Sequence, residues 1–169
     1  LSKCCGLVVD KLDQAINVGV DKRLAKKAKS NKVIGLCFGQ SDDGYLYPHT
    51  ERLKKLLEQK GFVVWSDEDA KEDIRSLLKM LAASDLMVCK PSGNRWYAQA
   101  VDCATLLVSG NSEPALLMPE FATDPVSPCM LHSVSQNSIA VVDCNCDKAE
   151  DLVESIESIF IHFAEQQDG

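Results

Sequence analysis

The chain has 169 residues, 46% of them hydrophobic, which is enough to bury the core of one domain of ordinary size with one appended element. Its formal net charge of −7 argues against general binding to nucleic acid, because phosphate would be repelled. No apolar run approaches the roughly 20 residues of a membrane-spanning helix, and no signal peptide is apparent. We therefore expect a cytoplasmic protein without membrane insertion and, since it begins at Leu1, a piece of a longer protein.

Eight cysteines raise the question of disulfides or a metal site, and their spacing argues against both. No two of them form a C-x-x-C pair, and Cys144 and Cys146 have no matching Cys/His pair nearby. Cys37 and Cys89 fall within apolar runs, where cysteine usually behaves as a small buried hydrophobe. We therefore interpret the cysteines as reduced thiols and predict no metal site.

Residues 1–31 are predicted to form an N-terminal helix and a basic linker. Apolar residues between positions 5 and 16 are spaced three and four apart, as in an amphipathic helix, and DKRLAKKAKSNK continues as a polar helical segment. Eight Lys/Arg against three Asp/Glu give residues 1–32 a net charge of +5, which leaves −12 for the rest. A basic surface is expected at Lys22, Arg23, Lys26, Lys27 and Lys29.

From residue 32 onward, short apolar runs alternate with amphipathic helical segments. The sequence predicts strands at KVIGLCFG, FVVW, DLMVC, PALLMP and SIAVVDC. This alternation is typical of a flavodoxin-like three-layer α/β sandwich, here with a five-stranded parallel sheet over residues 32–169 and the extra N-terminal helix. Helical core stripes are predicted at Leu53, Leu56 and Leu57, at Ile74, Leu77, Leu78 and Leu81, and at Leu152, Val153, Ile156, Ile159, Phe160 and Phe163.

Ligands of such sheets bind in the crevice outside the carboxyl ends of the strands. The loops at 39–47, 66–72, 90–96 and 119–128 are therefore expected to border any functional site. The first contains GQSDDG, which matches neither common glycine-rich phosphate-binding pattern. The second contains SDEDAKED, which lacks the regular ligand spacing of a calcium loop. No hydrolase motif is present either, so the sequence assigns no catalytic residue.

The order of these parts resembles a TIR (Toll/interleukin-1 receptor) domain over about residues 32–165. The resemblance rests on VIGLCFGQSDDGYL, RLKKLLEQKGFVVWSDED, LLKMLAASDLMVCKPSGNRWYAQAVD and PALLMPEF. It implies a signalling module of innate immunity that acts by self-association or by binding protein partners. The main contact loop of that family would correspond to Asp67, Glu68, Asp69, Glu72 and Asp73.

Some TIR domains cleave NAD with a glutamate four residues after a tryptophan, and counting from Trp96 gives Ala100 here. An alanine cannot stabilise a developing oxocarbenium ion, so the resemblance favours a protein without catalysis or a required cofactor. On the helix predicted over 94–108, Asp102 lies about 200° from Ala100 and faces solvent. Trp96 is interpreted as a packing anchor whose removal destabilises the fold. The inward face of that helix would consist of Tyr97, Ala100, Val101, Ala104, Leu107 and Val108.

Two other functions stay open on the same scaffold. An enzyme that processes NAD or a nucleoside, as a glycohydrolase or deoxyribosyltransferase, would need a carboxylate such as Asp42, Asp43 or Asp67. A non-catalytic nucleotide sensor would need only a groove, with NAD as a candidate ligand. Such a groove would be lined by Gly39, Gln40, Ser66, Trp96 and Ala100.

Overall fold

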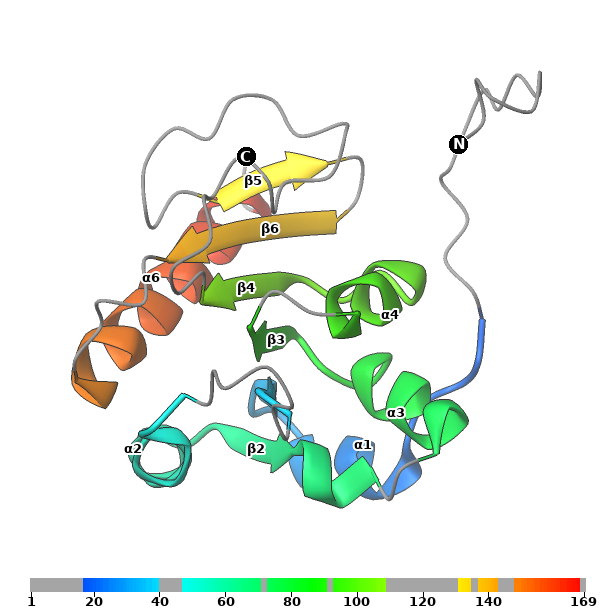
Figure 1. Cartoon of the computed structure of the whole chain (residues 1–169). Helices are drawn as coiled ribbons and strands as arrows, with labels where there is room; N and C mark the ends of the chain where they lie inside the picture. The colour runs from blue at the N-terminus through cyan, green and yellow to red at the C-terminus, as the bar shows by residue number, and fades with distance from the viewer. Residues whose placement is uncertain are drawn as a thin grey trace.

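The computed structural model describes residues 17–39, 47–70, 73–90, 93–108, 131–134, 137–142 and 148–167. In this part of the chain one sheet lies between two groups of helices, as Figure 1 shows. Helices α2 (Thr50–Gln59) and α6 (Ala149–Gln167) cover one face, and helices α1 (Lys22–Ala28), α3 (Ile74–Leu81) and α4 (Asn94–Ala100) cover the other. The arrangement is the three-layer α/β sandwich that the sequence predicts.

The sheet contains six strands in the described residues, in the order β2-β1-β3-β4-β6-β5. Strands β1 (Val33–Cys37), β2 (Val63–Ser66), β3 (Leu86–Cys89), β4 (Thr105–Val108) and β6 (Asn137–Val142) pair in parallel. Strand β5 (Leu131–Val134) is antiparallel to β6 and lies at the edge. The α/β class with a parallel sheet is confirmed, but the predicted five-strand count is not.

Two apolar cores hold the layers together, and β1 contributes to both of them because successive side chains of a strand point to opposite faces. Ile34 and Leu36 face α2 and α6, whereas Val33 and Cys37 face the other helices. All five residues of β1 are buried, as expected for a strand with both faces covered. Four residues of the predicted stripe of the last helix are confirmed as core, since Leu152, Val153, Ile156 and Ile159 are buried. Phe160 is partly buried, and the burial of Phe163 is outside the described part.

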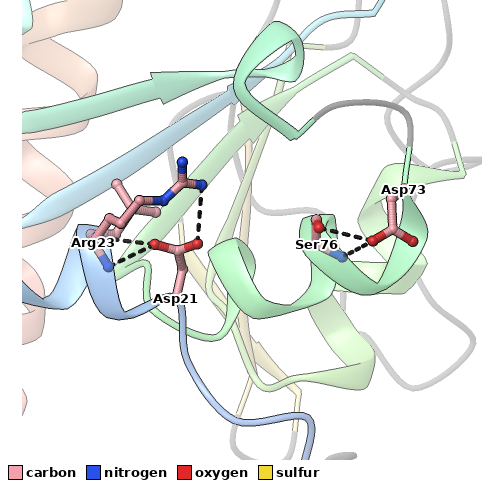
Figure 2. A network of polar contacts seen from close by, with 5 residues as sticks. Asp21, Arg23, Asp73 and Ser76 are labelled. Carbon is pink, nitrogen blue, oxygen red and sulfur yellow. Dashed lines mark hydrogen bonds and ion pairs between the residues drawn. The ribbon is translucent and has the colours of Figure 1, made fainter.

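Two aspartates begin helices on the second face by capping them, as Figure 2 shows. Asp21 accepts hydrogen bonds from the backbone N–H groups of Arg23 (2.9 Å) and Leu24 (3.0 Å) at the start of α1. Asp73 accepts from the N–H groups of Arg75 and Ser76, both at 3.2 Å, at the start of α3. Each carboxylate satisfies N–H groups that have no partner within the helix.

Helix α1 is packed onto the sheet rather than standing apart from it. Its Leu24 is buried in the core that also contains Trp65 of β2, and the backbone N–H of Asp21 donates to the carbonyl oxygen of Lys79 in α3 at 2.9 Å. The helical prediction for this basic segment is confirmed. The domain boundary between residues 31 and 32 stays a prediction, and residues 1–16 lie outside the described part.

The predicted helix over 94–108 is wrong in its second half. Helix α4 ends at Ala100, Asp102 adopts a left-handed turn (φ 61°), and Thr105–Val108 forms the fully buried strand β4. Ala104, Leu107 and Val108 therefore do not continue an inward helix face. A short apolar run cannot be assigned to helix or strand by periodicity alone, and TLLV is such a run. The expected strand PALLMP lies outside the described residues.

The α3 stripe also differs in one position, since Ile74 is 56% exposed while Leu81 is fully buried. Leu77 and Leu78 are partly buried. Ile74 is the first residue of the helix, where the chain has not yet reached the sheet.

None of the described helices combines the length and apolar composition required to cross a bilayer.

Candidate functional site

Three neighbouring parallel strands end together at one edge of the sheet. Cys37 at the end of β1 lies in register with Cys89 at the end of β3, and Leu36 lies in register with Ser66 at the end of β2. The residues that follow these strands are therefore brought together by the topology. We call the group formed by Cys37, Gly39, Asp67 and Lys90 the carboxyl-edge site.

Asp67 is the centre of this group. Its Oδ2 accepts a hydrogen bond from the backbone N–H of Gly39 at 2.6 Å, and its carboxylate also interacts with the Cys37 thiol and the Lys90 ammonium group. Gly39 has a φ of +67°, a conformation in which other residues are strained. A Cβ built on Gly39 would lie 3.9 Å from Cε of Lys90, so the lysine stem runs beside this glycine.

Burial dominates the electrostatics of the site. It raises the pKa of Asp67, while the hydrogen bonds from Gly39 and Cys37 and the charge of Lys90 act to lower it. Burial, together with the neighbouring Asp67, raises the pKa of the Cys37 thiol well above its usual value. Cys37 is therefore a protonated donor to Asp67 at neutral pH rather than a nucleophile.

Lys90 is buried to an unusual degree for a lysine, with only 8% of its surface exposed. The long apolar stem of a lysine can be covered while its ammonium group reaches a polar environment. Here that environment is the carboxyl-edge site, with Asp67 as a charged neighbour. A buried cation beside a carboxylate at this edge of a parallel sheet gives the site one fixed positive group.

The residues predicted to line a nucleotide groove lie on different elements of the structure. Gly39 and Ser66 lie at the ends of adjacent strands, while Trp96 and Ala100 lie on α4 and Gln40 lies outside the described residues. The backbone N–H of Ser66 is already used, since it donates to Asp69 at 2.9 Å. Of the predicted set, Gly39 is the residue that belongs to the carboxyl-edge site, where its backbone N–H donates to Asp67.

Trp96 is not a packing anchor, because 51% of its surface is exposed. It lies in the first turn of α4, and Ala98 provides the fully buried side chain of that helix instead. The prediction that Asp102 faces solvent is confirmed, although it does so from a turn rather than from a helix.

Trp96→Ala is therefore expected to lower the free energy of unfolding by only about 1 kcal/mol, less than the roughly 3–5 kcal/mol for a fully buried aromatic, because about half of this residue is exposed. Chemical denaturation of the wild type and the variant measures this difference. A loss of several kcal/mol would mean that the tryptophan packs against the domain after all.

Most acidic side chains of the predicted contact loop are engaged in contacts within the protein. Residues Asp67–Ala70 form a short 3-10 helix in which Asp67 turns inward to Gly39. Asp69 accepts from Ser66 and lies 4.0 Å from Nζ of Lys54, and Asp73 caps α3. Glu68 is exposed, and Glu72 lies outside the described residues. Three of these acids therefore have local structural roles.

The predicted basic surface is present on the outside of the molecule, because all five of its residues are exposed. No three His, Cys, Asp or Glu side chains come together as a candidate metal site within the described ranges. Cys37, Cys89 and Cys103 are buried free thiols, and burial raises the pKa of Cys103 to about 12.

An open groove lies between α2 and α6, away from the strand ends. Its volume is about 310 Å³, and its walls include Leu56, Val153 and Glu154. Two ion pairs border it, Arg52 with Glu150 and Lys60 with Glu157, and Glu154 adds a further negative charge. Because both of these cations already pair with carboxylates, the groove is the weaker candidate for an anionic ligand.

Sequence reasoning named Asp67 and the 90–96 loop but overlooked Lys90 and Cys37 as site residues. A signal was available, since Lys90 follows directly on the all-apolar run LMVC. A charged residue at such a strand end lies at the functional edge of a parallel sheet. The contact of Cys37 with Asp67 depends on the strand register and had no comparable signal.

No protein-family model matches the chain, and no curated protein matches it in sequence. Its fold is similar to that of Escherichia coli ADP-heptose LPS heptosyltransferase II, with a TM-score of 0.56 and 15% identity over 86% of this chain and 53% of that one. It is also similar to a glycosyl transferase of family 9 from Veillonella parvula, with a TM-score of 0.52 and 10% identity over 92% of this chain and 56% of that one. The chain thus spans about half the length of each, and the likeness is one of fold.

These comparisons overturn the identification as a TIR domain. The similar structures are glycosyltransferases rather than TIR domains, and no family model supports a TIR assignment. The predicted non-catalytic signalling function in innate immunity is therefore wrong. Its physical basis was weak, because alternating apolar strands and amphipathic helices of these lengths are common to many doubly wound folds.

Proposed function

We propose that this chain is the sugar-nucleotide-binding part of a glycosyltransferase and that the carboxyl-edge site holds the diphosphate of a nucleotide diphosphate sugar. The similarity in fold to an ADP-heptose-dependent transferase supports this class of ligand. The position of the site supports it as well, because ligands of open α/β sheets bind outside the carboxyl ends of the strands.

The observation that carries the proposal is the buried Lys90 at the end of β3, beside Asp67 and Gly39. A lysine ammonium group provides three donors and a compact charge, which suits a phosphate oxygen. Because the stem is buried, little side-chain freedom is left to lose when a ligand binds. The cation is held in place before the diphosphate arrives.

Asp67 has a supporting role in this proposal. By accepting from the Gly39 N–H at 2.6 Å, it fixes the backbone where the chain leaves β1. Gly39 has no side chain to fill the space beside Lys90, so a phosphate can approach the backbone closely. Asp67 is thus a positioning residue that acts through Gly39 and Lys90.

The proposal concerns binding by this part of the molecule. The fold likeness accounts for about half of each transferase, so we assign no catalytic base to the chain. Sugar transfer would require further groups facing the carboxyl-edge site. NAD, the ligand considered from the sequence, also contains a diphosphate and serves as a competitor in the test below.

Calorimetric titration with ADP, AMP and adenosine tests the proposal. We expect ADP to bind more tightly than AMP, and adenosine to bind least, because the diphosphate supplies the charge that Lys90 recognises. Lys90→Met keeps the stem and removes the charge. It should weaken ADP binding at least tenfold, since a hydrogen bond to a charged group contributes about 1.5–3 kcal/mol.

Lys32→Met is the matched control. Nζ of Lys32 lies 3.1 Å from Oδ1 of Asp85, an aspartate that, like Asp67, accepts a hydrogen bond from a backbone N–H, here that of Val33 at 2.8 Å. Lys32 and Asp85 lie at the opposite, amino end of β1. ADP affinity should be unchanged in Lys32→Met. Equal affinities for all three ligands, or equal losses in both variants, would contradict the proposal.

A further inference from the structure

Helix α1 carries a strongly basic outer face. Counting 3.6 residues per turn, Lys22, Arg23, Lys26 and Lys27 fall within an arc of about 140°, and Leu24 and Ala28 lie on the opposite side. The burial agrees, because the four cations are exposed while Leu24 is buried against the sheet. Lys29 follows at the C-terminal cap and is exposed too. We call these five residues the α1 basic face.

Most charges of this face have no ion-pair partner among the described residues. Arg23 pairs with Asp21 at 3.3 Å, but that carboxylate also caps the helix. The four lysines make no ion pair with any described carboxylate, whereas Lys32, Lys54 and Lys60 elsewhere on the surface each do. Four cations on and directly after two helical turns, with no ion pair in the described part of the chain, suit an extended anion better than one carboxylate.

An apolar side chain lies next to these cations. Val20 immediately precedes the capping Asp21 and is 50% exposed, although valine is usually buried. Cations with an adjacent exposed apolar group are what peripheral membrane proteins present to a lipid surface, where the charges meet headgroups and the apolar group enters the acyl boundary. A nucleic-acid phosphate backbone would leave Val20 exposed to water.

We propose that the α1 basic face docks the protein on an anionic lipid surface, without insertion of a helix. This inference does not depend on the proposed function. The face belongs to a single helix, which packs beside β2 (Figure 1) and turns its buried Leu24 toward the core that contains Trp65. The rest of the chain carries a net charge of about −12, so the α1 basic face is the part of this acidic protein that an anionic surface would attract.

Co-sedimentation of the full chain with vesicles tests this inference. The chain should bind vesicles of equal parts phosphatidylglycerol and phosphatidylcholine, should not bind phosphatidylcholine alone, and should be released by salt. The triple variant Lys22→Gln, Lys26→Gln, Lys27→Gln should lower the partition coefficient roughly 100-fold, since each cation near an anionic surface contributes about fivefold. Glutamine keeps a helix propensity close to that of lysine.

The control triple is Lys54→Gln, Lys55→Gln, Lys60→Gln on and beside α2, which removes the same charge and should leave vesicle binding nearly unchanged. Val20→Ser should weaken vesicle binding as well. The proposal is overturned if the two triples lose binding equally or if phosphatidylglycerol makes no difference. It is also overturned if the α1 face instead binds single-stranded RNA or a second copy of the chain while vesicles stay unbound.

Discussion

Trp65→Ala is expected to lower the free energy of unfolding by about 3–5 kcal/mol, the range for removing a large aromatic side chain from a core. Trp65 is the largest fully buried side chain described, at 1% exposure, and lies in the core between the sheet and α1, α3 and α4. Its Nε1–H donates to Oγ of Ser84 at 2.8 Å, and that hydroxyl donates to the carbonyl oxygen of Met80 at 2.8 Å. The substitution removes both the packing and this link.

Trp96→Ala provides the matched control, because it is the same chemical change at a half-exposed position. Urea denaturation of both variants, monitored by circular dichroism, gives the comparison. Similar unfolding midpoints for the two variants would contradict the arrangement of the second core.

Gly35→Ala is expected to destabilise the protein by about 1–3 kcal/mol through overpacking. A Cβ at this position in β1 would lie 2.4 Å from Cζ2 and 2.7 Å from Cε2 of Trp65, well inside van der Waals contact. The indole and the central strand cannot separate without disturbing the sheet. Gly93→Ala is the control, since a Cβ there meets no neighbour within 4 Å.

The two core substitutions should be coupled. In the double variant Gly35→Ala, Trp65→Ala, the alanine methyl group enters the space that the indole leaves, so the combined loss should be smaller than the sum of the single losses. A double-mutant cycle from denaturation curves measures the coupling. Strict additivity would mean that Gly35 and Trp65 do not touch.

Much of the fold could be predicted from the sequence because its strands and helices follow simple patterns. Three predicted strands consist of short, mainly apolar runs next to polar residues, and each run contains a strand of the described sheet. These runs are VIGLC, FVVW and DLMVC. The amphipathic spacing of Leu53, Leu57 and Ile156 likewise gave the helices their correct inward faces. Local pattern and burial agree in these segments.

The prediction of one helix over 94–108 is wrong because the apolar pattern of this segment does not distinguish a helix from a strand. In TLLV the apolar residues fit a helix or a strand equally well, and pairing with β3 and β6 selects the strand. The same helical pattern places Trp96 at the edge of the inward face beside Tyr97 and so predicts its burial, but its exposure depends on where α4 meets the sheet. Tertiary packing decides both cases, and no local signal reports it.

The candidate site was predictable in position but not in composition. Parallel topology alone placed it at the carboxyl ends of the strands. Which side chains converge there depends on the register that brings Cys37 beside Cys89 and on the turn that directs Asp67 to Gly39. The resemblance to a TIR domain is wrong for a related reason, because the order of strands and helices is not accompanied by a motif specific to one family.

Backbone-amide NMR during an ADP titration tests the central claim most directly, since it reports where the nucleotide binds. Saturable shifts are predicted at Gly39 and Lys90 at the carboxyl ends of β1 and β3, with little change at Val33 and Asp85 at the amino ends. In Lys90→Met these shifts should require at least tenfold more ADP. Shifts that cluster around Leu56 in the groove between α2 and α6, or no shifts at all, would contradict a sugar-nucleotide site at the carboxyl edge.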